Sequence, residues 1–423
     1  MPSPIRNRLP DPVPSLEGFE GIINTRPVQE IGYGGLVIGR NVEVNDQKKL
    51  IRRNGYKLVR SGVYSALYGS QTQAQLLVVH AGDLALVAPD GGERVLASGL
   101  SDGVYSWDED PANSIYYTSS RGSNGIVLVN SLWRPLALVT PVIASVAAIE
   151  TAPWIVTPFN LGKTYDQNVV HLFAAYAYPD GREGPPSEAV TISVAPEVSL
   201  IQMSVPVLPN CTTMVYATAP GGSAYYLVAA STVSGFTFPT YFLHLQHTGE
   251  DYPYTTVIEG FPVEAYLLAF SGGRLYAACY DADTQLGTIY CSLPLQYHLF
   301  DKTADFVVTS GAPQLLLDCA SGLIIGTDSN LYLWNGERLQ QLANYGVPPG
   351  VCGDVTMDGT AFFWTLRGIG SVKAGQYGLV TEQSYSADPG VFNHARIFYE
   401  RGYAKLVAST VSGNPVFNKW SSR

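Results

Sequence analysis

The stretch Leu76-Leu77-Val78-Val79-His80-Ala81-Gly82-Asp83-Leu84-Ala85-Leu86-Val87 decides the fold class. In it, two apolar runs flank a short turn that contains glycine and aspartate. Short apolar runs bounded by such residues are typical of β-strands joined in a hairpin. A second turn, Pro89-Asp90-Gly91-Gly92, leads into another short run that begins at Arg94. The stretch therefore predicts three successive antiparallel strands.

A similar unit recurs later in the chain. Residues 322–342 repeat the order of apolar strand, aspartate-containing turn, strand, glycine turn and basic-led strand. Their glycine turn, Asn335-Gly336, is a strong hairpin signal. Weaker versions of the unit begin near residues 114, 273, 359 and 403. Units that each form a small antiparallel sheet are typical of a β-propeller. The sequence thus predicts an all-β fold, a β-propeller of about six blades.

Residues 141–258 interrupt this rhythm. A long apolar strand at 169–178 ends at the turn Pro179-Asp180-Gly181, and a loop then leads to a strand at 189–194. This order resembles the late strands of a fibronectin type III domain, which implies a β-sandwich inserted between the second and third blades. The predicted domains are an N-terminal arm with the first strands, a first part of the propeller, the inserted sandwich and a second part of the propeller: 1–60, 61–140, 141–258 and 259–423.

The composition indicates a β-protein with an unusually uncharged surface. Hydrophobic residues make up 46% of the 423 residues, and charged residues make up 14%, against about 25% in an ordinary soluble domain. Tyrosine (27) outnumbers lysine and arginine together (25). So few charges suit a subunit whose flanks are covered by neighbours. The net charge of −10 argues against a surface dominated by nucleic-acid binding.

No signal peptide or membrane-spanning segment is expected, because the proline-rich start lacks an apolar core and no run of 18 apolar residues occurs. Helical periodicity is scarce, and only residues 14–20 and 386–396 are expected to hold a helical turn. The five cysteines show no close Cys-x-x-Cys spacing. Four of them lie in strand-like runs and are expected to be buried, reduced thiols: Cys279, Cys291, Cys319 and Cys352.

No motif indicates a catalytic, metal or cofactor site, and the chain is not expected to be an enzyme. His244 and His247 have a spacing that suits a metal on a helix, but no helix is expected there. The loop with Asp281 and Asp283 and the acidic run 108–110 are interpreted as solvated turns. No Gly-x-Ser-x-Gly nucleophile elbow is present. The six tryptophans are interpreted as packing between blades rather than as sugar-binding platforms: Trp107, Trp133, Trp154, Trp334, Trp364 and Trp420.

The N-terminal region carries a more specific pattern. Gly21-Ile22-Ile23-Asn24 precedes Asn41-Val42-Glu43-Val44-Asn45-Asp46, and Arg52-Arg53-Asn54-Gly55-Tyr56 follows. The alternation at Val42–Val44 and the apolar pair Leu50-Ile51 predict two short strands. The whole pattern resembles the opening of the tail hub, nozzle and stabilisation proteins of short-tailed phages, which carry proline where this chain has Asn54.

The resemblance implies a structural virion protein of a phage tail, assembled in the host cytoplasm. It implies a homo-oligomeric ring, commonly a hexamer, that docks beneath adaptor proteins on the portal side, anchors tail fibres and lines or gates the DNA exit channel. Genomic DNA would slide through without sequence-specific binding, past an acidic wall that repels it. Arg52, Arg53 and Tyr56 are candidate anchors, either between subunits or against the first blade.

Two other functions stay open at this point. One is a receptor-binding or fibre-associated tail protein whose exposed aromatic residues recognise a host surface glycan. The other is a propeller glycosidase with paired carboxylates on its loops. The sequence does not fix the ring size, the channel-facing residues, the blade count, the host, or a short-tailed against a long-tailed phage.

Overall fold

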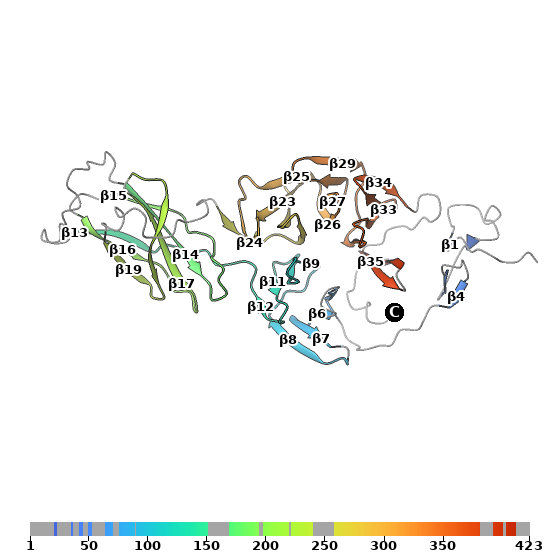
Figure 1. Cartoon of the computed structure of the whole chain (residues 1–423), viewed down its shortest axis with the longest axis horizontal. Helices are drawn as coiled ribbons and strands as arrows, with labels where there is room; N and C mark the ends of the chain where they lie inside the picture. Colours follow the sequence, from blue (N-terminus) through green and yellow to red (C-terminus); the bar gives the residue numbers. More distant parts are fainter. Residues whose placement is uncertain are drawn as a thin grey trace, which may run out of the picture.

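The computed structural model is an all-β protein (Figure 1). It describes residues 64–70, 76–88, 90–150, 169–193, 198–219, 221–239, 258–380, 392–400 and 403–411, together with four short strands near the N-terminus. Within these residues no helix occurs, and nearly all strand pairs are antiparallel. The expectation of an all-β fold is confirmed.

The first two sheets follow directly on one another and each has four strands. The first sheet comprises β5 (Ala66–Gly69), β6 (Leu76–His80), β7 (Asp83–Val87) and β8 (Glu93–Ser98), paired in chain order. The second comprises β9 (Tyr105–Glu109), β10 (Ile115–Ser119), β11 (Asn124–Val127) and β12 (Trp133–Arg134), also in chain order. The three strands expected from the opening stretch are β6, β7 and β8.

Four more sheets follow from residue 259. The third has β21 (Leu267–Ser271), β22 (Arg274–Asp281), β23 (Leu286–Leu293) and β25 (Phe306–Ser310), with β20 (Glu259–Gly260) and β24 (Gln296–Phe300) joined to one end of β23. The fourth has β26 (Pro313–Cys319), β27 (Gly322–Thr327), β28 (Leu331–Trp334) and β29 (Leu339–Ala343). Asn335-Gly336 joins β28 to β29 as a hairpin, as expected, with Trp334 opposite Leu339.

The fifth sheet has β31 (Gly353–Val355), β32 (Ala361–Thr365), β33 (Gly368–Lys373) and β34 (Gln376–Leu379). The sixth is different, because the long strands β35 (Phe392–Glu400) and β36 (Tyr403–Val411) are joined only by the two-residue parallel strand β30 (Gly350–Val351). The helical turn expected within 386–396 is wrong for the described part, residues 392–396. Ala395 and Ile397 are both buried, and this period of two favours a strand.

Neighbouring sheets touch through their first strands. In turn β9 contacts β21, β21 contacts β26, β26 contacts β31, and β31 contacts β35. The circuit closes at β5, where Tyr68 stacks on the ring of Trp107 in β9 and lies beneath the guanidinium of Arg396 in β35. The six sheets therefore surround a common centre. We call this arrangement the ring of sheets.

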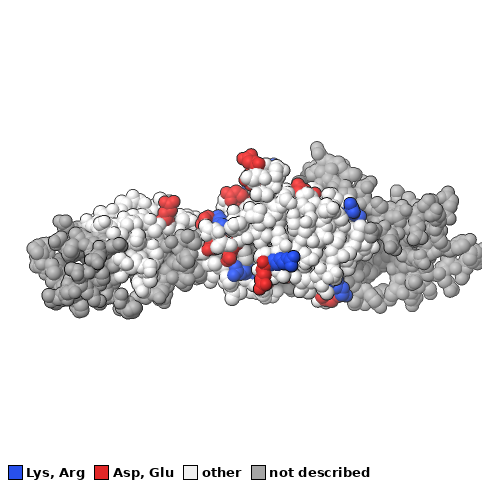
Figure 2. Space-filling model, turned by 90° about the horizontal axis from the view of Figure 1, so that it is seen from above, with Lys and Arg blue, Asp and Glu red and all other residues white. Residues whose placement is uncertain are grey.

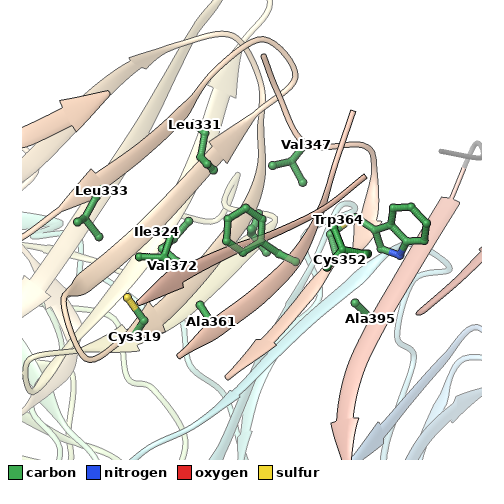
Figure 3. Packing of buried hydrophobic residues seen from close by; sticks show 13 residues of the cluster. Cys319, Ile324, Leu331, Leu333, Val347, Cys352, Ala361, Trp364, Val372 and Ala395 are labelled. Carbon is green, nitrogen blue, oxygen red and sulfur yellow. The ribbon is translucent and has the colours of Figure 1, made fainter. Parts of the chain in front are cut away.

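Apolar side chains fill the space between sheets. Figure 3 shows the cluster between the fourth and fifth sheets, where Ile324, Leu331 and Leu333 lie opposite Ala361 and Val372. Such interlocking of two sheet faces supplies the main stabilisation of a β-fold. All five cysteines are free thiols, in agreement with the expected reduced state, and all but the half-buried Cys279 are buried.

The chain leaves the ring of sheets after β12 and forms a separate two-sheet sandwich (Figure 1). One sheet orders its strands as β13 (Ser145–Glu150), β16 (Val198–Ser204) and β19 (Gly235–Pro239). The other orders them as β15 (Val190–Ser193), β14 (Val169–Ala177), β17 (Thr212–Thr218) and β18 (Tyr225–Ser231). Alternate residues of β14 and β16, among them Leu172, Ala174, Ile201 and Met203, form the core between them.

Short strands near the N-terminus match the two expected there. β3 (Val42–Val44) pairs antiparallel with β4 (Leu50–Arg52), so that Val42 lies opposite Arg52. β1 (Gly21–Ile22) pairs in parallel with β2 (Gly35–Leu36). Of the three candidate anchors, Arg52 is the last residue of β4, whereas Arg53 and Tyr56 lie outside the described residues. The expected helical turn at 14–20 also lies outside them.

Candidate functional site

A cavity of about 330 Å³ lies at the centre of the ring of sheets. Its wall is built from the first strand of every one of the six sheets, so each strand contributes its inward-facing side chains. The charged side chains of this wall are four carboxylates and one arginine, and the hydroxyl of Tyr68 lies beside them: Asp108, Glu109, Asp318, Asp354 and Arg396. These residues come from β5, β9, β26, β31 and β35, and only the fold brings them together.

Asp108 joins the second sheet to the third. Its Oδ2 accepts a hydrogen bond from the backbone N–H of Phe270 in β21 at 2.7 Å, and its Oδ1 accepts one from the N–H of Glu109 at 2.8 Å. Ser106, two residues earlier, bonds the backbone of Leu268 in the same way, with its Oγ accepting from the N–H at 3.0 Å. Side chains of β9 therefore accept the backbone N–H groups of β21 that would otherwise bond to a neighbouring strand.

The environment of Asp108 raises its pKa. Burial is the main cause, and it raises the pKa to about 7 against the two backbone hydrogen bonds, with Asp318 adding to the rise and Arg396 opposing it. The expectation that residues 108–110 form a solvated turn is therefore wrong. Asp108 and Glu109 belong to strand β9, and Asp110 is buried and accepts a hydrogen bond from the N–H of Ser114 at 2.8 Å.

Asp354 performs the same task at the joint between the fifth and sixth sheets. Its Oδ2 accepts a hydrogen bond from the N–H of Ile397 in β35 at 2.8 Å, and its Oδ1 accepts one from the N–H of Val355 at 2.9 Å. The guanidinium of Arg396 lies 3.7 Å from the same carboxylate. Asp108 and Asp354 are thus matching clamps on the first strands of two different sheets.

The remaining polar groups of the cavity also bridge sheets. The hydroxyl of Tyr68 donates to Glu109 at 3.1 Å, which links the first sheet to the second. Burial and then the charge of Glu109 raise the pKa of Tyr68 well above its usual range, so this hydroxyl keeps its proton. Burial likewise raises the pKa of Asp318, which is opposed by a hydrogen bond to Ser271 of the third sheet. The carboxylates therefore serve as joints between strands.

A second polar cluster fixes the sandwich to the ring of sheets. Arg182 of the sandwich donates to the carbonyl of Pro135 at 2.9 Å and pairs with Asp180 at 2.8 Å. Arg134 of β12 lies 3.3 Å from the same carboxylate. Burial alone would raise the pKa of Asp180, but its bonds to Arg182 and the charge of Arg134 outweigh burial and lower it. We call this group the sandwich junction.

A buried histidine completes the sandwich junction from the third sheet. Nε2 of His298 in β24 lies 2.9 Å from the carbonyl oxygen of Glu183 and, as the proton-bearing nitrogen, donates to it. Burial lowers the pKa of His298 to about 4, so the ring is neutral near pH 7. Both β12 and β24 therefore hold the same loop of the sandwich.

Replacing Arg182 by alanine is expected to lower the free energy of unfolding by about 2 kcal/mol, because Oδ2 of Asp180 loses two guanidinium N–H donors and the Pro135 carbonyl loses a charged donor. Chemical denaturation of the two proteins would measure this. Arg121→Ala, at an exposed turn of the second sheet, is the matched control and should change stability by less than about 0.5 kcal/mol. Equal effects of the two substitutions would contradict a bracing role for the junction.

The other candidate residues do not form a site. His244 and His247 lie outside the described residues. Asp281 accepts from the N–H of Asp283 at 2.9 Å and from the hydroxyl of Thr284 at 2.8 Å, so this acidic loop is closed on itself. Among the described residues no group of three or more histidine, cysteine, aspartate or glutamate side chains is placed to hold a metal ion.

The described tryptophans pack between strands rather than project as platforms. Trp107 stacks on Tyr68, the indole N–H of Trp133 donates to Tyr117 at 2.8 Å, and Trp364 is buried. Trp334 is partly buried against the third sheet. These four agree with the expectation of packing, whereas Trp154 and Trp420 lie outside the described residues.

The surface is poor in charge and carries isolated large apolar side chains. Figure 2 shows only scattered acidic and basic residues on the described part of one face. The most exposed apolar side chains include Met357 (85%), Leu295 (72%) and Val142 (71%). No helix of the described residues is long and apolar enough to cross a membrane.

Comparison with known proteins identifies no family. No protein-family model and no curated protein matches the chain. The computationally designed protein Ika8 is 11% identical over 82% of this chain and 96% of its own, with a TM-score of 0.29. The AfRom2 CNH domain is 8% identical over 85% and 99%, with a TM-score of 0.28. A gluconolactonase from Xanthomonas campestris is 12% identical over 73% and 85%, with a TM-score of 0.25. Likeness at this level assigns neither a fold family nor a function.

Proposed function

We propose that this chain is an architectural subunit of a phage tail, a nozzle or hub protein that forms a homo-oligomeric ring in the virion. In this proposal the ring of sheets is a six-bladed β-propeller and the sandwich is a fibronectin III-like insert. The order β15-β14-β17-β18 in the second sheet of the sandwich supports the latter, because that domain type also has a four-stranded sheet of this connectivity.

The observation that carries the proposal is that two carboxylates in the central cavity bind backbone N–H groups of neighbouring strands. A catalytic carboxylate needs an oxygen directed at its substrate. Both oxygens of Asp108 and both oxygens of Asp354 instead accept backbone N–H groups. Together with the N-terminal resemblance, this supports a protein whose polar core holds strands together.

The uncharged surface supports an assembled state. A free protein gains solubility from many charges, whereas a subunit covers its flanks with neighbours. In the proposed ring, subunit contacts hold the genome in place until receptor engagement shifts them. The net charge of −10 is compatible with an acidic channel wall past which DNA slides.

Copy number in particles and mass in solution test the proposal. In purified tails the chain is expected at the copy number of a cyclic ring, measured by quantitative mass spectrometry against a tail protein of known stoichiometry. Light scattering of the purified chain, alone and mixed with adaptor proteins, should give multiples of the 45.6 kDa subunit mass. A chain that stays monomeric with adaptors and is absent from particles would overturn the proposal.

A propeller glycosidase is the second candidate, because four acidic side chains line one cavity. Asp318 and Glu109 are the pair to replace, since both carboxylate oxygens of Asp108 and of Asp354 already accept backbone N–H groups. Release of reducing ends from polysaccharide by the purified chain, lost in Asp318→Asn and in Glu109→Gln, would favour this candidate. A receptor-binding tail protein instead predicts glycan binding without release of reducing ends.

A further inference from the structure

The sixth sheet has an open edge. Among the described residues β36 pairs only with β35, whereas each of the other five sheets contains at least four strands. β35 and β36 are nine residues each and pair along their whole length. An edge of this length presents a row of unpaired backbone groups, which proteins ordinarily cover. Two further strands would complete the sixth sheet.

Chain order identifies two such strands. In the first and third sheets, the outermost strand is followed along the chain by the first strand of the next sheet, as β8 is by β9 and β25 is by β26. The strands that directly precede β5 are β3 and β4, an antiparallel hairpin. β5 belongs to the first sheet, which lies beside the sixth through Tyr68 and Arg396. The hairpin therefore stands in the chain where the third and fourth strands of the sixth sheet are missing.

We propose that hairpin β3–β4 completes the sixth sheet of its own chain, with β3 paired antiparallel to the open edge of β36. An isolated two-stranded hairpin is at best marginally stable in water, so it needs such a partner. The strand directions agree, because β36, β3, β4 and β5 would alternate as successive strands do in the other sheets. In Figure 1 the hairpin lies beyond β35, on the side away from the sandwich.

The connecting segment is long enough. Thirteen residues, 53–65, lie between Arg52 and Ala66 and can span about 40 Å. The distance from an outermost to an innermost strand of a four-stranded sheet is about 15 Å, three strand spacings. Closure within one chain also benefits from the high effective concentration of a tethered strand. The N-terminal region thereby acts as the closing element of the ring of sheets, and this holds whether or not the chain assembles in a virion.

Disulfide trapping in the purified full-length chain tests the closure. Glu43→Cys and, separately, Val44→Cys sample both faces of the hairpin, and each is combined with Lys405→Cys, Val407→Cys or Ser409→Cys in β36. At least one double variant is expected to form a cross-link within a monomer, identified by peptide mass spectrometry. The control pairs Glu43→Cys with Val308→Cys, an exposed position on β25 of the third sheet, and should not cross-link. The single variants exclude links to the native cysteines.

Cross-links that join two chains would show that the hairpin completes the sheet of a neighbouring copy and would overturn closure within the chain, as would no link in any of the six variants. Hydrogen exchange gives an independent measurement. Val44→Pro removes a backbone donor from β3 and is expected to speed amide exchange within 403–411 by about tenfold, without changing exchange in β27. Unchanged exchange within 403–411 would also overturn the proposal.

Discussion

Gly350→Ala is expected to lower the free energy of unfolding by at least about 3 kcal/mol. Gly350 has a φ of +131° and sits in the short parallel pairing with Asn393 that connects β30 to β35. A methyl group there would overlap the carbonyl of Asn393 and lie 2.7 Å from its backbone nitrogen. Asn393 is fully buried and its N–H donates to Pro349 at 2.9 Å, so the backbone has little room to move.

The measurement is equilibrium denaturation followed by tryptophan fluorescence. Gly378→Ala is the matched control, because Gly378 lies in the outer strand β34 and a Cβ there meets nothing within 4 Å. Its stability should stay within about 1 kcal/mol of the original protein or rise slightly. A loss of stability of similar size in both variants would contradict the prediction, because the overlap of the Gly350 methyl group with Asn393 would then not be its cause.

Local patterns in the sequence predicted many of the individual strands. The glycine and aspartate turns beside β6 and β7, and Asn335-Gly336 beside β28, place strand ends to within a residue or two, because turn geometry depends on a few neighbouring residues. β33 was not anticipated, because its sequence Gly368-Ile369-Gly370-Ser371-Val372-Lys373 contains two glycines that weaken a strand signal.

The central site could not be predicted from local patterns. Asp108, Glu109 and Asp110 form an acidic run in the sequence. Nothing near this run shows that Phe270, 162 residues after Asp108, supplies the N–H that Asp108 accepts. The same holds for Asp354 and Ile397. A useful signal would have been an acidic residue on an otherwise apolar strand, since burying a carboxylate requires such partners.

Asp108 and Asp354 show how neighbouring sheets of the ring are held together without strand pairing between them. The first strands of adjacent sheets are not paired with one another in a ladder, so backbone N–H groups on their facing sides need other acceptors. Asp108 and Asp354 meet this need with two carboxylate oxygens each. The apolar cluster behind them, shown in Figure 3 for the fourth and fifth sheets, supplies the larger share of the stability.

Asp108→Asn is expected to change how stability depends on pH. The pKa of Asp108 is raised to about 7 in the folded protein, against about 3.9 in an unfolded chain. Between these values the folded state holds a proton that the unfolded state has released, so this group's contribution to stability falls as pH rises from about 4 to about 7. Asparagine cannot ionise, so the original protein should lose about 3 kcal/mol relative to the variant across this window.

Urea denaturation at several pH values measures this difference, and subtracting the two curves cancels the other titrating groups. Asp358→Asn is the control with the opposite sign. A hydrogen bond from the hydroxyl of Thr356 lowers the pKa of Asp358 to about 2, so its contribution is lost only as pH falls below about 4. The Asp358→Asn difference should therefore stay constant from about pH 4 to about pH 7. If the Asp108→Asn difference is constant there too, Asp108 is ionised throughout, and the cavity is open enough to bulk water to hydrate its charge.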